Sequence, residues 1–252
     1  MAATSDGSPL VKPFGFAGLC LGLIGIIAFG LLVTAGLGAI AAAVAALVMG
    51  WQGFIGAMNA ALARGADETP ILVALSLMLY FGIAAGVFAA AKWQGQSKWR
   101  DLIGWRPFRL FDGRIWAIMI AALVYSMIAN GALEHFFPHP PAQLTIPADP
   151  AAAAALFVLA VVFAPVTEEL VFRGWLYTGL RFNGGVWPAL LTTSALFAAA
   201  HYESTHFYTL AVFPVGLALG AIRECTGSVK ASMFFHAINN FAAFVLSLLV
   251  HS

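Results

Sequence analysis

Long apolar runs dominate the chain, and polar positions are gathered into the short segments between them. Seven runs contain no Asp, Glu, Lys or Arg, and they cover residues 13–63, 69–91, 115–133, 150–167, 182–202, 204–222 and 231–252. Each approaches or exceeds the roughly 18–20 apolar residues that cross a hydrocarbon core as a helix. The runs are rich in Ala, Leu and Gly and lack the strict alternation of a membrane barrel strand. The pattern predicts an all-α, polytopic helical membrane protein with seven to eight transmembrane helices.

The first run decides between seven and eight spans. Residues 13 to about 50 are too many for one upright span, so they form either one long tilted helix or a hairpin that turns at Gly36 and Gly38. A single helix gives seven spans and a cytoplasmic N-terminus, whereas a hairpin gives eight spans and an external N-terminus. We favour the single helix, followed by an interfacial helix over 51–65. No internal repeat is visible, and we expect one transmembrane domain over residues 1–252.

The fourth run has a clear helix start and an internal proline. Asp149 can accept a hydrogen bond as N-cap, and Pro150 suits the first helical position. Pro165 falls inside the same helix, where its missing N–H would free the carbonyl of Val161 and produce a kink. We therefore expect polar backbone to open beside the charged residues that follow.

The amino-acid composition indicates that the protein lies in a lipid membrane, and it excludes several classes of function. The chain is 62% hydrophobic and 9% charged, so most of its surface must face the lipid bilayer instead of water. A formal net charge of +1 without a basic stripe predicts no nucleic-acid partner. Cys20 lies in the first run and Cys225 in a short loop, which predicts neither a disulfide nor a thiolate metal cluster.

Basic residues predict the orientation in the membrane. Six of the 12 Lys and Arg residues fall between residues 92 and 114, and Arg181, Arg223 and Lys230 lie in two further connections. The Pro-rich segment 134–150 contains none. The positive-inside rule then places the basic connections in the cytoplasm. The Ala-rich composition is typical of a bacterial source, so we expect an inner (cell) membrane protein.

Three ionisable residues interrupt the fourth span. Such residues cost roughly 2.5–3.5 kcal/mol each at the centre of a membrane helix, so they are usually paired and functional. Glu169 and Arg173 are four residues apart on one face and can neutralise each other. Glu168 points about 100° away and has no local basic partner. A buried ion pair that locks two helices together would explain Glu169 and Arg173, but Glu168 fits a general acid or base better.

Later spans supply further polar side chains at helical spacing. Phe197 and His201 are four residues apart in the fifth span, and His236 and Asn240 are four apart in the last. A lone histidine on an apolar helix is most often a packing residue. The distances of Glu168, His201 and His236 from the basic connections nevertheless allow all three to meet within the cytoplasmic half to the middle of the bilayer, with His201 as the poorest match. The other histidines, His135, His139, His206 and His251, lie in loops or at the end of the chain.

Other hydrolytic centres are not encoded. The sequence has no H-E-x-x-H zinc motif, no serine in a G-x-S-x-G setting and no pair of aspartates inside a span. Hydrolytic chemistry would therefore have to come from Glu and His.

Together these residues resemble the three motifs of the CAAX-prenyl endopeptidase and bacteriocin-processing family, also called Abi or CPBP. The motifs are Glu168-Glu169-x-x-x-Arg173, Phe197-x-x-x-His201 and His236-x-x-x-Asn240, within the blocks "EELVFRGWL" and "TGSVKASMFFHAINN". The resemblance covers about residues 150–245, the expected catalytic core, with a weaker likeness in "DLIGWRP". It implies a helical intramembrane endopeptidase with a site that opens to the cytoplasm.

The resemblance also implies a role for each motif residue. Glu168 and His201 would activate a water, His236 and Asn240 would stabilise the oxyanion, and Arg173 would hold Glu169. A zinc ion held by Glu168, His201 and His236 is one mechanism, and metal-free general-base catalysis is the other, which we favour.

The substrate would be a membrane-associated peptide or lipidated protein, with a prenylated CAAX-type substrate among the candidates. A non-catalytic immunity or scaffold protein of the same family is the alternative function, and a proton-coupled transporter that uses Glu168 as a relay is a third.

Overall fold

The computed structural model describes residues 14–63, 70–136, 146–147, 149–202 and 208–251, and these residues contain helices and connections but no strand. The predictions for residues 1–13, for most of the Pro-rich segment with His139, and for His206 lie outside the described residues. The elements are α1 (Phe16–Ala63), α2 (Pro70–Gly95), η2 (Gln96–Lys98), α3 (Trp99–Leu102), α4 (Gly113–Phe136), α5 (Pro150–Val158), η3 (Leu159–Phe163), α6 (Ala164–Glu169), η4 (Leu170–Leu176), α7 (Tyr177–Gly184), α8 (Val186–Ala200), α9 (Tyr208–Thr226) and α10 (Val229–His251). The all-α prediction is therefore confirmed.

Several of these helices suit a membrane by length and composition. Within the described part of the chain, four helical stretches are long and apolar enough to cross it: Phe16–Ala60, Val73–Leu102, Pro150–Gly184 and Val229–Leu249. Two shorter apolar stretches lie within α4, at Gly113–Ala129, and along the whole of α8, Val186–Ala200. The chain is an integral membrane protein, as predicted. The predicted number of seven to eight spans is not confirmed, although each of the seven charge-free runs overlaps a helix within the described residues.

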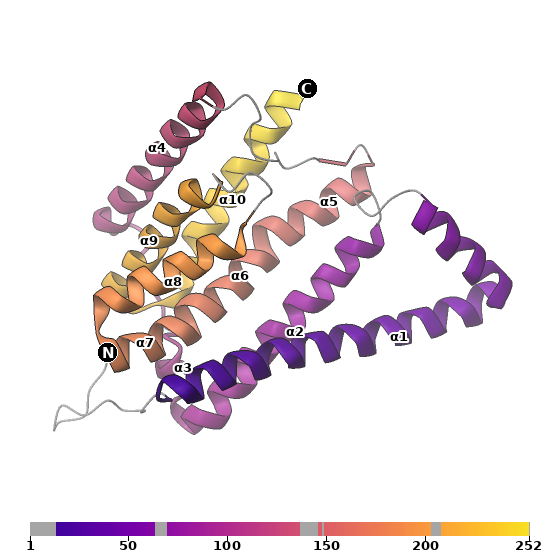
Figure 1. Ribbon diagram of the computed structural model, residues 1–252, viewed down its shortest axis with the longest axis horizontal. Coiled ribbons are helices and arrows are strands. Elements are labelled where there is room, and N and C mark those ends of the chain that lie inside the picture. The colour runs from indigo at the N-terminus through magenta and orange to yellow at the C-terminus, as the bar shows by residue number, and fades with distance from the viewer. Residues whose placement is uncertain (1–13, 64–69, 137–145, 148, 203–207, 252) are drawn as a thin grey trace.

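Helix α1 follows the single-helix interpretation of the first run. Gly36 and Gly38 lie inside it, and its backbone leaves helical geometry only at Gly50, where φ is 74° and ψ is 156°. The stretch before this break, 16–49, is about 50 Å long at 1.5 Å per residue, against roughly 30 Å of hydrocarbon. Figure 1 shows α1 leaning away from the other helices along much of its length. A steep tilt reconciles its length with a single crossing.

One continuous helical rod carries the glutamates. It runs from α5 through η3, α6 and η4 to α7, and we call it the central helix (150–184). Asp149 caps its start, since the Ala152 N–H donates to Asp149 Oδ2 at 2.8 Å, as predicted. The segments η3 and η4 are π-helical, with wider turns than an α-helix. Pro165 sits in the first turn of α6, immediately after η3.

The connections with most of the basic residues meet at one end of the bundle. This basic end comprises Lys92, Lys98, Arg100, Arg106, Arg181, Arg223 and Lys230. Here the segment 101–106 covers the turn between α9 and α10, because the Val229 N–H donates to the Gly104 carbonyl at 2.9 Å and the Ser228 hydroxyl donates to the Arg106 carbonyl. Ser228 and Val229 are fully buried as a result. Helix α10 thus begins below the surface of the basic end.

Candidate active site

Glu169 and Arg173 form a fully buried ion pair on the central helix. Arg173 Nη1 donates to Glu169 Oε1 at 2.9 Å, and neither side chain is exposed. Arg173 Nη2 also donates to the Gly216 carbonyl on α9 at 2.8 Å. The spacing of four residues predicts this pair, and the contact with α9 adds a tertiary anchor. A buried charge of either sign is tolerated only with such compensation.

Glu168 faces a different environment. Its Oε1 accepts a hydrogen bond of 3.1 Å from the Tyr80 hydroxyl on α2. Its Oε2 is buried and has no hydrogen-bond partner among the described residues. The same Oε2 lies 3.9 Å from Nε2 of His201 and 3.9 Å from Nε2 of His236. An unsatisfied carboxylate oxygen between two imidazoles is what a bound water or a reacting group would fill.

Both histidines are held through Nδ1. His201 lies directly after the last residue of α8, and its Nδ1 is 2.8 Å from the carbonyl of Phe197, which the end of the helix leaves free. His236 Nδ1 is 3.1 Å from Glu169 Oε1. A carbonyl and an ionised carboxylate can only accept, so Nδ1 carries the proton in both rings. In the neutral rings each Nε2 therefore presents a lone pair toward Glu168.

Phe197 connects these groups by packing. The ring is 1% exposed, and its centroid lies 4.5 Å from the Arg173 guanidinium carbon. It also packs against His201 at 4.6 Å and, edge to face, against His236 at 5.4 Å between ring centroids. Sequence spacing identifies Phe197 as a motif residue, and its contacts show that it fixes the two imidazoles and the guanidinium relative to one another.

Asn240 reaches the central helix through a main-chain carbonyl. Its Nδ2 donates to the Ala160 carbonyl at 2.9 Å. In a π-turn that carbonyl would pair with the amide of residue 165, and Pro165 has no N–H. The sequence predicts that the proline frees the carbonyl of Val161, as in an α-helix. The π geometry shifts the expected partner by one residue, and the carbonyl that Asn240 reaches is that of Ala160.

The structure joins five of the six predicted residues, Glu168, Glu169, Arg173, His201 and His236, by contacts of 3.9 Å or less, and the sixth, Asn240, lines the same cavity as the two histidines. Their depths also agree. Glu168 lies sixteen residues before the end of α7 and His201 fifteen after the start of α8, which corresponds to about 24 and 22 Å of helix. The late start of α8 removes the mismatch that the sequence predicts for His201. His236 is only seven residues into α10, but α10 begins below the surface.

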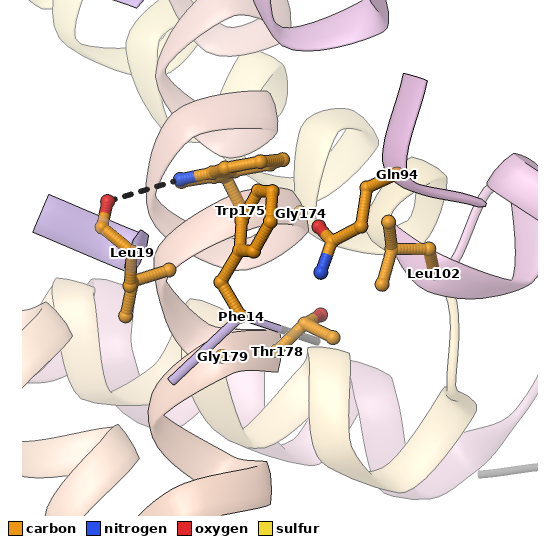
Figure 2. Close-up of a pocket in the computed structure, with 8 residues that line it drawn as sticks. All are labelled: Phe14, Leu19, Gln94, Leu102, Gly174, Trp175, Thr178 and Gly179. Atoms are coloured by element: carbon orange, nitrogen blue, oxygen red, sulfur yellow. Dashed lines mark hydrogen bonds between the residues drawn. The ribbon is translucent and has the colours of Figure 1, made fainter. Parts of the chain in front are cut away.

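A large cavity opens beside this network. It measures about 510 Å³ and is lined by α4, α9 and α10 together with His201, His236 and Asn240. Most of the lining is apolar, and the exceptions include Ser126, whose buried hydroxyl has no partner among the described residues, and Asn239. A second cavity of about 10 Å³ lies beneath Trp175, between α1, α2 and the central helix (Figure 2). It has room for about one water, so these helices pack closely against one another there.

Comparison with known proteins finds a family match for the part of the chain that carries the predicted residues. Residues 150–242, which contain all six predicted residues, match the family described as "Type II CAAX prenyl endopeptidase Rce1-like". This segment is similar to the Rce1-like family. A curated relative, an uncharacterized 24.3 kDa protein of Escherichia coli, is 29% identical over 126 residues. That alignment covers 48% of this chain and 58% of the relative, and no solved structure matches the chain.

The spacing of the possible zinc ligands in the Rce1-like segment is wider than a zinc site requires. Zn²⁺ ligands stand about 2.0–2.2 Å from the metal, so two tetrahedral ligands are roughly 3.3–3.6 Å apart. The two Nε2 atoms are each 3.9 Å from Glu168 Oε2, which is wider. Among the described residues, no group of three His, Cys, Asp or Glu side chains has a metal-binding arrangement. The donor types suit zinc but their spacing does not fit it, so we derive no step through a metal.

Two contacts of the Rce1-like segment lie beyond what spacing in the sequence predicts. Tyr80 belongs to α2 and reaches Glu168 from 88 residues away, and the Gly216 carbonyl reaches Arg173 from α9. Tyr80 carried one weak signal, because it is a hydroxyl inside a charge-free run. Gly216 carried none, because a backbone carbonyl is present at every residue.

Proposed function

We propose that the protein is an intramembrane endopeptidase in which Glu168 is the general base. The observation that carries this proposal is Glu168 Oε2, which is buried, has no hydrogen-bond partner among the described residues, and lies 3.9 Å from Nε2 of His201 and of His236, the two histidines that line the large cavity. The match to a family described as CAAX prenyl endopeptidase supports the same reaction class. A non-catalytic partner protein would have no need for this arrangement.

The first step of the proposed reaction activates a water. A water about 2.8 Å from both Glu168 Oε2 and His201 Nε2 fits atoms that are 3.9 Å apart. Glu168 accepts one proton of this water, and His201 Nε2 accepts a hydrogen bond from the other, which orients the oxygen toward the substrate. The oxygen then attacks the carbonyl carbon of the scissile peptide bond and forms a tetrahedral oxyanion.

The second step collapses that intermediate. Asn240 Nδ2 donates one hydrogen to Ala160, so its second hydrogen is available to the oxyanion. His236 also donates to the oxyanion from Nε2 when the ring holds a second proton, taken from solvent before the reaction and kept throughout it, and Glu169, 3.1 Å from Nδ1, stabilises that imidazolium. The C–N bond breaks, the proton on Glu168 passes to the leaving amine, and the carboxylate of Glu168 is restored.

The proposed substrate is a membrane-associated peptide or lipidated protein. The cavity has the volume of a typical ligand pocket and a mainly apolar lining, which suits an apolar side chain or a lipid group next to the scissile bond. A prenylated CAAX-type sequence is the specific candidate, on the strength of the family match. We place the site toward the cytoplasmic side of a bacterial inner membrane, because the basic end shares that side under the positive-inside rule.

The decisive experiment compares Glu168→Gln with the wild-type protein. The purified full-length chain is incubated in detergent with an internally quenched peptide, either farnesylated at a C-terminal CAAX sequence or unlipidated, and the products are identified by mass spectrometry. We expect Glu168→Gln to lower kcat at least 100-fold, within the range for loss of a general base. Asp112→Asn, the same chemical change on an exposed ion pair with Arg114, should keep wild-type activity. Cleavage by Glu168→Gln at the wild-type rate would disprove the proposed base.

A second arm addresses zinc. The wild-type protein is dialysed against a chelator, assayed, and assayed again after Zn²⁺ is restored. We expect less than a twofold change in kcat/KM, because the proposed mechanism uses only side chains. A loss of activity that Zn²⁺ alone reverses would replace the metal-free mechanism with zinc-assisted hydrolysis at the same residues.

A further inference from the structure

A small polar cavity lies at the basic end, away from the proposed peptidase site. It measures about 60 Å³, and its lining includes Arg106, Arg181 and Arg223 together with Asp101, Glu224 and Thr178. A water needs roughly 10–15 Å³ of such space, so the cavity holds a few waters or one small ion. We call it the Arg223 pocket.

Two of its three arginines are already paired. Arg106 donates twice to Asp101 Oδ1, at 3.1 and 2.7 Å. Arg181 donates to both oxygens of Glu224, each at 2.7 Å. Each pair is neutral, so the five charged side chains of the lining, three arginines and two carboxylates, leave a net charge of +1.

That excess charge belongs to Arg223. The residue is 9% exposed, and its Nε donates to the Arg173 carbonyl at 3.2 Å while Nη2 donates weakly to the Thr178 hydroxyl at 3.4 Å. Both acceptors are neutral, and among the described residues no carboxylate lies within 4.0 Å of the guanidinium. Nη1 makes no hydrogen bond to any described residue. A guanidinium this buried is normally paired with an anion.

The backbone is shaped to hold this guanidinium in place. Gly104 has a φ of 69°, and a Cβ added there would lie 2.4 Å from Arg223 Cζ. Only glycine allows such an approach together with positive φ. The Gly104 carbonyl accepts from Val229, so the segment over Arg223 is itself fixed. The pocket is therefore built around a charge that the protein does not neutralise.

We propose that the Arg223 pocket binds the phosphate group of an anionic lipid headgroup. Guanidinium and phosphate form charge-assisted hydrogen bonds, and the pocket admits one tetrahedral anion. Asp101 and Arg106 of the lining come from the segment 92–114, and the exposed apolar side chains of that segment, including Trp93 and Phe111, favour a lipid over free phosphate as the source. An anion here neutralises Arg223, which hydrogen-bonds to the backbone of the central helix at Arg173. Lipid binding would thus stabilise the helix that carries Glu168.

Thermal unfolding tests this without any cleavage assay, so its outcome is independent of the proposed peptidase activity. Full-length protein in neutral detergent and phosphate-free buffer is titrated with phosphatidylglycerol, phosphatidylcholine or inorganic phosphate. We expect saturating phosphatidylglycerol to raise Tm by about 5 °C or more, and the other two ligands to raise it by less than half as much. An equal response to inorganic phosphate would overturn the lipid assignment, and no response to either anion would overturn the site.

Variants locate the binding within the pocket. Arg223→Gln should weaken phosphatidylglycerol binding roughly 10–100-fold, as expected for loss of a charged hydrogen-bond donor. Arg109→Gln removes an exposed basic charge from the same connection as Arg106 but outside the pocket, and should change Kd less than twofold. Equal loss in both variants would indicate unspecific attraction and overturn the proposal.

Glu224→Gln keeps the proposal falsifiable if Arg223→Gln does not fold. It removes a negative charge from the lining, so the anion should bind more tightly, by up to roughly fivefold. An Arg223 with a purely structural role predicts no such gain. Unchanged or weaker phosphatidylglycerol binding by Glu224→Gln would overturn the site.

Discussion

At the residue scale, two neighbouring glutamates have opposite surroundings. Glu169 is fully buried, and its Oε1 accepts hydrogen bonds from both Arg173 and His236. The Glu168 side chain is 17% exposed, and it accepts a hydrogen bond from one neutral donor, the Tyr80 hydroxyl. Burial penalises a carboxylate unless a cation offsets the lost hydration. Glu169 has that cation, so we infer that its role is to support structure, whereas Glu168 is left able to exchange a proton.

This difference predicts that Glu169→Gln lowers stability while Glu168→Gln does not. Removal of Glu169 leaves Arg173 charged and fully buried without a counterion. The free energy of unfolding should fall by about 3–5 kcal/mol, the usual cost of breaking a buried pair from one side. Thermal or denaturant unfolding in detergent measures this change, and Glu168→Gln, with no ion pair to break, should stay within about 1 kcal/mol of wild type.

The double variant Glu169→Gln with Arg173→Met serves as the control. It removes both charges and should recover part of the lost stability, because an apolar replacement of a buried pair is often neutral. Full recovery is not expected, since the Gly216 carbonyl loses its donor. Activity should not return in either case, because His236 no longer has an ionised acceptor. If Glu169→Gln and Glu168→Gln were equally stable, the structural role of Glu169 and the catalytic role of Glu168 would not be separate.

At the element scale, the central helix shows what sequence can and cannot predict. The Asp149 cap and the Glu169–Arg173 pair depend on residues three and four apart, so local spacing predicted both correctly. Pro165 predicted a disturbed helix, but not two π-helical segments on either side of α6. Because Pro165 has no N–H, the Ala160 carbonyl in the π-turn needs a donor from a side chain that is distant in the sequence. Here it is Asn240 from α10, 80 residues away.

The link between Pro165 and Asn240 leads to a prediction about the rod itself. Pro165→Ala restores an N–H that can pair with the Ala160 carbonyl and so compete with Asn240. We expect unchanged or higher Tm together with a fall in kcat of about tenfold, because a proline inside a helix costs stability and Asn240 loses its anchor. Asn240→Ala should also lower kcat, but with a loss of Tm, since it leaves the carbonyl without a donor.

Pro214 provides the matched control for this prediction. It also lies inside a helix, α9, but has no neighbouring π-helical segment. Pro214→Ala should therefore leave kcat within about twofold of wild type. Melting curves and steady-state kinetics on the three variants decide the matter. A kcat for Pro165→Ala equal to that of Pro214→Ala would show that the proline has no part in positioning the site.

At the scale of the whole molecule, the number of membrane crossings was the least predictable feature. Charge-free runs mark seven helices, yet length and apolarity qualify four, with two shorter apolar ones beside them. Of the other helices, α8 is only 15 residues long, and α9 carries polar groups that neighbouring elements satisfy. Helix α9 ends with Arg223 and Glu224, both of which have contacts inside the basic end. A count made from single runs does not include such compensation.

The orientation of the bundle can be tested with a natural probe. Cys225 is exposed at the basic end, and Cys20, the other cysteine, is removed by Cys20→Ser. If the basic end faces the cytoplasm, a membrane-impermeant maleimide should label Cys225 in inside-out vesicles and leave it unlabelled in right-side-out ones. A permeant maleimide should label both preparations, and the variant without cysteines should be labelled in neither. Labelling confined to right-side-out vesicles would place the basic end outside the cell, and with it the Arg223 pocket. A lipid that occupies that pocket would then have to come from the outer leaflet.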